Sequence, residues 1–420
     1  MKRTHAATAG PEPGPGHGSL RADFRAVLGN GAFRALFVAH FASNVGDWLA
    51  FMALFSLASF EWGADVLGVS FLAIAYMLPL ATVSPVAGVW VDRWDLRRVL
   101  VWSDLLRAGI VLGMALSSSF IGMCLLLFLH QTVACFFNPA QHAAIPRLVE
   151  RRHILAANAL NTQAAHFTKI LGPGVAGVLV ALLGVRGCFY VDAATFAVSG
   201  ALLMLLPRLV VTARASDEPQ SVHRDFRAGV AFLRRAPRVR RVILMLLVCL
   251  GALGGFIAVL PVYARDQLEA GAKLMGLLLS CLGVGAVVGA AVVAHTGRHW
   301  DKMRSMAGGA LGAGLALWML SQAARAGLAL PATVLLGAAV AAMLVPAHAL
   351  VQEETPAALL GRVTSLSVSI LSVAQVTGMG LAGAASRALE TPKLLAAMAV
   401  SLAAVGAASA FQGLHRRSAG

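Results

Sequence analysis

Charged side chains are scarce in this sequence. Only 13% of its 420 residues are Asp, Glu, Lys or Arg, whereas 58% are hydrophobic and the mean hydropathy is +0.77. Soluble domains carry about a quarter charged residues, and a globular core of this length could not bury so much apolar surface. A bilayer accepts such a chain. The composition therefore excludes an ordinary soluble protein and predicts a membrane protein.

Motifs for ATP hydrolysis and for familiar hydrolytic chemistry are also missing. None of the five lysines follows a glycine, so there is no nucleotide-binding P-loop and ATP-driven pumping by this chain is excluded. The sequence contains neither His-Glu-x-x-His nor Gly-x-Ser-x-Gly. Its five cysteines lie inside apolar runs without metal-ligand spacing, which predicts neither disulfides nor zinc. We therefore expect no enzyme activity, no cofactor and no metal.

Twelve apolar runs fill most of the chain. Each is continuous for about 20 residues and lacks the alternation of a barrel strand, so each predicts a membrane-spanning helix. The runs lie at about 35–60, 66–90, 99–118, 120–143, 156–184, 187–206, 241–263, 273–295, 305–323, 328–352, 361–386 and 393–412. The predicted fold class is an all-α polytopic membrane protein with 12 transmembrane helices.

The runs fall into two sets of six, separated by a basic segment. We predict a disordered cytoplasmic tail at 1–30, without a cleaved signal peptide because no apolar h-region is present. Within the segment, 222–242 predicts an arginine-rich amphipathic helix on the inner leaflet. The remaining predicted domains are an N-terminal six-helix bundle at 31–207, a basic cytoplasmic linker at 208–240, a C-terminal six-helix bundle at 241–412 and a cytoplasmic tail at 413–420.

The basic residues indicate an orientation. With both termini inside, 26 of the 34 lysines and arginines fall in inner segments and six fall outside, a strong positive-inside signal. This predicts a bacterial cytoplasmic (inner) membrane protein with both termini cytoplasmic. This placement accounts for the net charge of +15, so the charge does not indicate binding to nucleic acid.

The two sets of runs show weak internal similarity. At a shift of 206 residues, 172–177 aligns with 378–383, and 94–98 aligns with 300–304. Transporters built from two such halves hold substrate near the bilayer midplane between them and alternate access by rocking one half. This organisation favours a transporter over a membrane enzyme.

The loop after the second run carries the most specific motif of the chain. The segment Gly88-Val-Trp-Val-Asp92-Arg93-Trp-Asp95-Leu-Arg97-Arg98 resembles the Gly-x-x-x-Asp-Arg-x-Gly-x-Arg-Arg signature of the major facilitator superfamily, with Asp95 in place of a glycine. The resemblance implies the major facilitator fold and a gating motif of Gly88, Asp92, Arg93, Arg97 and Arg98. In that family the aspartate is thought to close the inner face by meeting a helix N-terminus, an interaction of about 0.3–1 kcal/mol. The alternative is a charged turn that keeps positive residues inside.

The fifth run carries Gly172-Pro173-Gly174-Val-Ala176-Gly177. It resembles the Gly-Pro-x-x-Gly-Gly signature of the superfamily's antiporters, with Ala176 for one glycine, and so implies export by exchange through Gly172, Pro173 and Gly177. The alternative is close helix packing at a proline kink. Further stretches, including 43–47 and 137–140, resemble the branch that contains macrolide-efflux proteins and the enterobactin exporter. The resemblance covers about residues 33–410.

Three ionisable side chains are predicted on the coupling or substrate path, because a charge at bilayer depth is costly and marks such paths. Asp47 lies about 20 Å along its helix from Arg34. It is predicted to bind a proton or a substrate cation, or else to be a structural carboxylate. His130 either relays protons or forms a hydrogen bond between helices. Lys169 either faces the cavity, where it would pair with Asp47, or extends toward the inner surface.

Other charged residues are given lesser roles. The three-residue spacing of Asp104 and Arg107 predicts an ion pair on a helix surface near the inner interface. Asp192 is predicted to have a structural role near the outer surface. One glutamate is expected to pair with Arg362 or with the loop arginines. The predicted inner gate consists of Glu353, Glu354 and Arg362.

These features together predict a secondary active transporter. We expect it to export a small amphiphilic compound of drug, macrolide or siderophore type by alternating access, with proton-coupled antiport. Its partners would be the small-molecule substrate, protons and membrane lipids, and it would function as a monomer. The alternative is a lysophospholipid flippase of the same fold. A more distant one is a membrane enzyme or scaffold that does not transport.

Overall fold

The computed structural model describes residues 20–91, 93–209, 231–296 and 301–415. Throughout these ranges the secondary structure is helical, without a strand. Nine of the described helical segments are long and apolar enough to cross a membrane. The predicted all-α polytopic membrane fold is therefore confirmed.

The first half begins with the short helix α1 (Leu20–Gly29). Helix α7 covers two predicted runs, and Gly184 breaks its geometry with φ 71° and ψ 171°, at the expected boundary between them. Only glycine adopts such a conformation readily. The elements that follow α1 are α2 (Gly31–Ser56), the π-helical η1 (Leu57–Glu61), α3 (Val66–Thr82), α4 (Ser84–Val91), α5 (Leu96–Leu116), α6 (Phe120–Leu148), the 3₁₀ turn η2 (Arg151–His153) and α7 (Ile154–Leu203).

The second half repeats this succession of long helices. Its elements are α9 (Pro237–Val262), the π-helical η3 (Tyr263–Gln267), α10 (Ala272–Thr296), α11 (Lys302–Gln322), α12 (Ala326–Glu354), α13 (Ala357–Ala385) and α14 (Thr391–His415). Each of the twelve predicted runs lies on a described helix, while the number of twelve membrane crossings stays a prediction.

Two aspartates 206 residues apart begin corresponding helices of the two halves. Asp95 accepts a hydrogen bond from the Arg97 amide at 3.0 Å and caps α5. Asp301 accepts one from the Met303 amide at 2.8 Å and caps α11. A side-chain oxygen in this position satisfies an amide that the helix leaves unbonded. The shared cap explains why the loop motif carries Asp95 where the superfamily signature has glycine.

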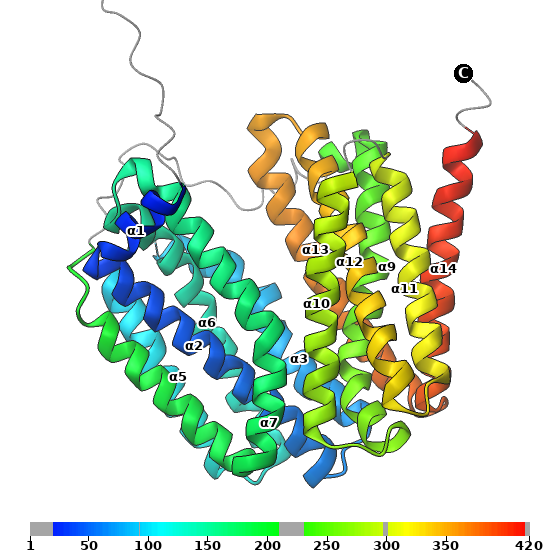
Figure 1. The fold of residues 1–420 in the computed structure, drawn as a ribbon, viewed down its shortest axis with the longest axis horizontal. Coiled ribbons are helices and arrows are strands. Elements are labelled where there is room, and N and C mark those ends of the chain that lie inside the picture. The colour runs from blue at the N-terminus through cyan, green and yellow to red at the C-terminus, as the bar shows by residue number, and fades with distance from the viewer. Residues whose placement is uncertain (1–19, 92, 210–230, 297–300, 416–420) are drawn as a thin grey trace, which may run out of the picture.

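Figure 1 shows the two halves as bundles standing side by side. Helix α1 and the C-terminal end of α14 lie at the same end of the molecule, which we call the terminal end. The opposite end, where η1 and η3 lie, is called the far end. The bundles approach each other toward the far end and diverge toward the terminal end. Contacts between α7 and α10 join them in between.

The structure differs from the predicted domain boundaries in two places. Residues 20–29, expected in a disordered tail, form α1, because Val27 is buried in the first-half core and Asp23 lies 3.2 Å from His153. The predicted amphipathic helix at 222–242 falls partly outside the described residues, and its described part is interrupted. Residues 231–235 are helical, Ala236 leaves the helix with φ −105° and ψ 83°, and Pro237 opens α9. A residue before proline avoids helical geometry, and proline suits a first helical position.

Candidate functional site

A cluster of charged side chains lies buried inside the first half. Asp104, Arg107, His130 and Asp192 are each at most 3% exposed, and the Asp47 side chain is 29% exposed. They come from four helices, α2, α5, α6 and α7. Buried charges in membrane-spanning helices are costly and require a specific reason, so this cluster is the candidate functional site.

Arg107 lies at the centre of the cluster. Its Nη2 donates to Asp104 Oδ1, and its Nη1 lies 3.6 Å from Asp47 Oδ2. The guanidinium carbon is 4.3 Å from the centre of the Phe196 ring and 4.8 Å from that of Phe137. A planar guanidinium can stack on aromatic faces and bond a carboxylate at its edge, which a lysine ammonium cannot do equally well.

Asp104 is fully engaged on both carboxyl oxygens. Oδ1 accepts from Arg107, and Oδ2 accepts from the hydroxyl of Ser199 on α7. The pairing of Asp104 with Arg107 was predicted, but its location on the helix surface was wrong. Their face of α5 packs inside the bundle, and a sequence does not indicate which side of an apolar helix its neighbours cover.

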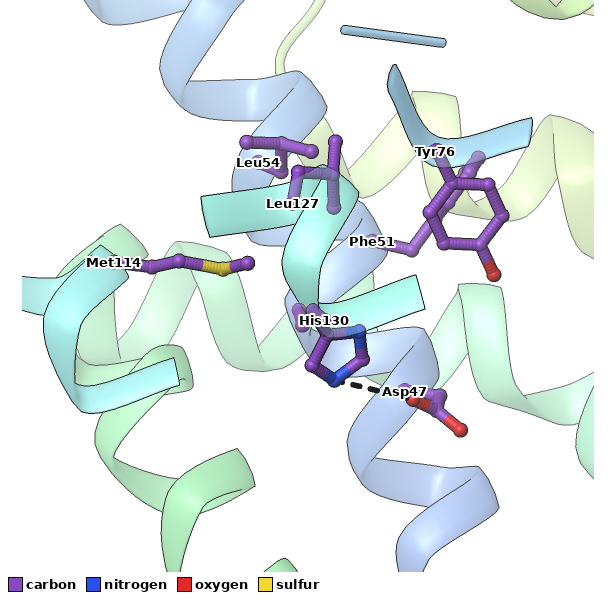
Figure 2. A pocket seen from close by; sticks show the side chains of 8 residues that line it. Asp47, Phe51, Leu54, Tyr76, Met114, Leu127 and His130 are labelled. Carbon is purple, nitrogen blue, oxygen red and sulfur yellow. Dashed lines mark ion pairs between the residues drawn. The ribbon is translucent and has the colours of Figure 1, made fainter. Parts of the chain in front are cut away.

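Asp47 lies beside a pocket in the first half. Its Oδ1 is 3.9 Å from His130 Nε2, the pair joined by the dashed line in Figure 2. The other walls of the pocket are apolar or aromatic, including Phe51, Tyr76 and Met114. An apolar pocket with a few polar groups at one side is typical of sites for small organic ligands. The structure thus brings together Asp47 and His130, two of the three predicted path residues.

Lys169, the third predicted path residue, forms no ion pair with Asp47 in the described structure. Its side chain is exposed on α7, and Asp47 has Arg107 as its charged partner instead. Arg107 was not predicted for the path, because its spacing from Asp104 is also that of an ordinary surface ion pair on a helix.

The antiporter-like motif forms a close backbone contact between the halves. A Cβ atom on Gly276 of α10 would lie 2.3 Å from the carbonyl oxygen of Pro173, and one on Gly177 would lie 2.7 Å from that of Ala272. The Gly174 amide donates to Ser280 Oγ at 2.8 Å. Small residues permit this backbone approach. On the other side of α7, Gly172 packs against Trp48 of α2.

The loop motif lies at the terminal end. Gly88 has open space around it, since a Cβ atom there would meet nothing within 4 Å. Arg93 and Arg98 are exposed, and Arg97 donates to the carbonyl of Met204 within the same half. Asp92, the central residue of the predicted gating motif, lies outside the described residues.

The predicted inner-gate glutamates also lie at the terminal end. Glu353 pairs with Lys302 at the start of α11, and Glu354 pairs with Arg238 at the start of α9, at 2.9 Å. Arg362, an expected partner, lies on α13, but its side chain is outside the described part of the structure. Exposed pairs of this kind contribute about 0–1 kcal/mol each.

A link between the halves at the far end was not predicted. Arg265 of η3 donates from Nη1 to the carbonyl oxygens of Ser59 at 2.5 Å and Ala64 at 3.0 Å. Both acceptors belong to the segment that joins α2 to α3. The sequence carries no signal for this link, because the acceptors are backbone atoms that any residue would provide.

Metal binding finds no support in the described ranges, where no group of three or more His, Cys, Asp or Glu side chains could hold an ion.

Comparison with known proteins agrees with this architecture. The sequence model of the Major Facilitator Superfamily matches residues 36–379. The chain is 28% identical over 348 residues to the uncharacterized MFS-type transporter YfiS of Bacillus subtilis, covering 81% of this chain and 83% of that protein. It is 27% identical over 389 residues to the enterobactin exporter EntS of Shigella boydii, covering 86% of each. The predicted resemblance to the macrolide-efflux and enterobactin-exporter branch is confirmed.

Solved structures give the same fold at lower sequence identity. The nucleoside transporter NupG, in its D323A mutant, superposes with a TM-score of 0.77 at 11% identity, covering 91% of this chain and 99% of that one. The prediction that the protein is not an enzyme is also confirmed, because the family and the relatives are transporters. The chain is an integral membrane transporter of the Major Facilitator Superfamily.

Proposed function

We propose that the protein exports a small amphiphilic compound from the cell in exchange for protons, and that Asp47 carries the exchanged proton. The observation that carries this proposal is the position of Asp47, which borders the apolar pocket while lying 3.6 Å from Arg107 and 3.9 Å from His130.

The exchange follows from competition at one carboxyl group. The Asp47 side chain is 29% exposed, so protons and ligands can both reach it. An ionised Asp47 attracts the basic or hydrogen-bond-donating end of a compound whose apolar body fills the pocket. A protonated Asp47 loses that attraction, and the compound leaves. Binding of substrate and of proton therefore exclude each other, which is the requirement for antiport.

The orientation indicates which end of the path would open to each side of the membrane. The described parts of the predicted inner segments, with their excess of arginine, lie at the terminal end, and cytoplasmic loops carry such an excess. The terminal end would then face the cytoplasm. The link from Arg265 to Ser59 would close the path on the outer side. The loop motif from Gly88 to Arg98, together with Glu353, Glu354 and Arg362, would close the inner side in the opposite conformation, and one monomer would suffice for the cycle.

The names of two relatives favour a small exported compound over a lipid. One relative is named as an exporter of enterobactin and another as a macrolide efflux protein.

The test uses purified protein in liposomes with an imposed pH gradient. The probes are ethidium, erythromycin and a tris-catechol chelator, each followed with and without an uncoupler. We expect the gradient to drive the flux of at least one probe, and the uncoupler to abolish it. Asp47→Asn, which mimics the protonated carboxyl, should weaken binding of the probe and abolish gradient-driven flux, and Glu61→Gln, which changes an exposed carboxyl, should behave as wild type. Gradient-driven flux that survives Asp47→Asn would refute the role of Asp47.

A further inference from the structure

Asp192 of α7 is a buried carboxyl to which the proposed transport cycle gives no role. It is 0% exposed, and its Oδ2 finds no hydrogen-bond partner among the described residues. Its Oδ1 lies 3.4 Å from the hydroxyl of Thr195, which donates to the Asp192 carbonyl oxygen at 2.8 Å. The sequence predicted a structural group near the outer surface. Its burial instead gives it an unpartnered polar atom inside the bundle.

The turn of α2 that carries Asp47 packs directly against Asp192. A Cβ atom on Gly46 would lie 2.1 Å from Asp192 Oδ1 and 2.2 Å from Thr195 Oγ1. Only hydrogen fits at position 46, so the carboxyl lies against the backbone beside Asp47. The two carboxyls thus belong to one electrostatic cluster.

The cluster contains more acidic groups than basic ones. Three carboxyls belong to it, and the guanidinium of Arg107 pairs with two of them, Asp47 and Asp104, but not with Asp192 in the described structure. The cysteine Cys188, one turn before Asp192 on α7, carries no charge as a thiol and does not change this balance.

The two nearby histidines do not supply the missing positive charge. His40 Nε2 lies 2.9 Å from the side-chain amide of Asn44, and its Nδ1 is buried without a hydrogen-bond partner in the described structure, which disfavours a charged ring. Both ring nitrogens of His130 are buried without a hydrogen bond in the described structure, close to the Arg107 cation. A second positive charge there would be unfavourable.

A buried carboxylate without a counter-charge takes up a proton instead of staying ionised. Asp104 has hydrogen bonds on both oxygens and pairs with Arg107 as the ionised member. Asp47 and Asp192 are left to take up protons. We propose that Asp192 is a second proton-binding carboxyl of the transport site, which titrates together with Asp47 across Gly46.

The two groups form a coupled pair. Loss of the proton from Asp47 places a negative charge next to Asp192, which strengthens the hold of Asp192 on its own proton. Protons then leave in two steps that belong to the pair and not to either residue alone. This inference rests on the proposed function for its part in transport, but the binding of two protons is measurable without substrate.

The experiment is an infrared pH titration of the purified protein in lipid, following the carbonyl stretch of protonated carboxyl groups. We expect the wild type to lose this signal in two steps as the pH rises. Asp192→Asn and Asp47→Asn should each keep one of the two steps, and the double variant should show neither step. Asparagine has the shape of a neutral aspartic acid, so the variants should fold, which their thermal unfolding checks. Glu61→Gln, at an exposed carboxyl, should keep both steps.

Two results would overturn the inference. Asp192→Asn with the same two steps as wild type means that Asp192 takes up no proton. A carbonyl signal that never titrates in wild type and disappears in Asp192→Asn means that Asp192 is a fixed hydrogen-bond donor. These results are separable from failure of the proposed function. If wild type shows no gradient-driven flux but the variants titrate as expected, the exchange proposal fails and the proton site at Asp192 stands.

Discussion

Arg265 of the second half donates a hydrogen bond to the carbonyl oxygen of Ser59 in the first half, across 2.5 Å at the far end of the molecule. The same nitrogen lies 3.0 Å from the carbonyl oxygen of Ala64. Asp266 holds the other side of the guanidinium, with 2.6 Å between its Oδ1 and Arg265 Nε. One side chain, oriented by its neighbour, thus joins the two halves through backbone atoms.

Arg265→Ala should favour conformations open at the far end. Hydrogen bonds to charged groups contribute about 1.5–3 kcal/mol each, so their loss should raise the open population by about tenfold or more. The measurement is the labelling rate of Met114→Cys in the pocket by a membrane-impermeant thiol reagent added from the far side. The background would have its five native cysteines replaced.

Arg387→Ala is the matched control for this measurement, because it removes an exposed arginine from the same end. Equal labelling rates in the two variants would show that the Arg265 link does not hold the far end closed.

Arg107→Met should destabilise the protein by about 3–5 kcal/mol, the usual cost of leaving a buried charge without its partner. The ionised Asp104 would then lack its cation. Asp104→Asn in the same chain should recover most of the loss, because it removes the uncompensated charge. Denaturant unfolding in detergent compares the three proteins. A double variant as unstable as the single one would indicate that Arg107 acts mainly through its aromatic contacts.

Gly276→Ala should weaken the contact between α7 and α10. Its Cβ atom would lie 2.3 Å from the Pro173 carbonyl oxygen, and overpacking of this kind costs about 1–3 kcal/mol. We expect a lower unfolding temperature and slower efflux. Gly308→Ala on α11 is the control, because a Cβ atom there meets nothing within 4 Å. If both variants unfold like wild type, the halves do not depend on this backbone contact.

Features that depend on local sequence could be predicted, whereas features that depend on packing between distant helices could not. The helices, and the break near Gly184, could be predicted because apolar runs and glycines are local signals. The cluster could be predicted only in part. Asp47 and His130 stand out in the sequence as ionisable residues in long apolar runs, but the spacing of Arg107 from Asp104 predicts an ordinary surface pair. The role of Arg107 depends on which face of α5 turns inward, and that is fixed by neighbours from distant parts of the chain.

The gating prediction depends on an asymmetry between the halves. The first half carries Asp92-Arg93, which the corresponding loop of the second half lacks. We expect Asp92→Ala to reduce transport far more than Asp301→Ala. The second change should mainly cost about 0.5–2 kcal/mol of stability, as is usual for loss of a helix cap, because Asp301 bonds the amides of Met303 and Arg304. Flux assays beside unfolding curves separate the two effects, and equal losses of flux would contradict the asymmetry.

Gly88 offers a test of whether the loop motif acts in a different conformation. Because Gly88 has open space in this structure, Gly88→Ala should leave the unfolding temperature unchanged. If the loop packs closely when the terminal end shuts, the same variant should slow efflux. Normal efflux in Gly88→Ala would mean that the glycine is not required for closure.

The contact between α7 and α10 also limits how the halves can move. Gly177 meets Ala272, Gly276 meets Pro173, and Gly283 meets Ile170, so the two helices touch along residues 272–283 of α10. At 1.5 Å per residue this line of contact is about 17 Å long, and α10 continues beyond it to Thr296. A motion that opens the terminal end can therefore keep this line of contact and displace mainly the remaining part of α10, together with the helices of its own half.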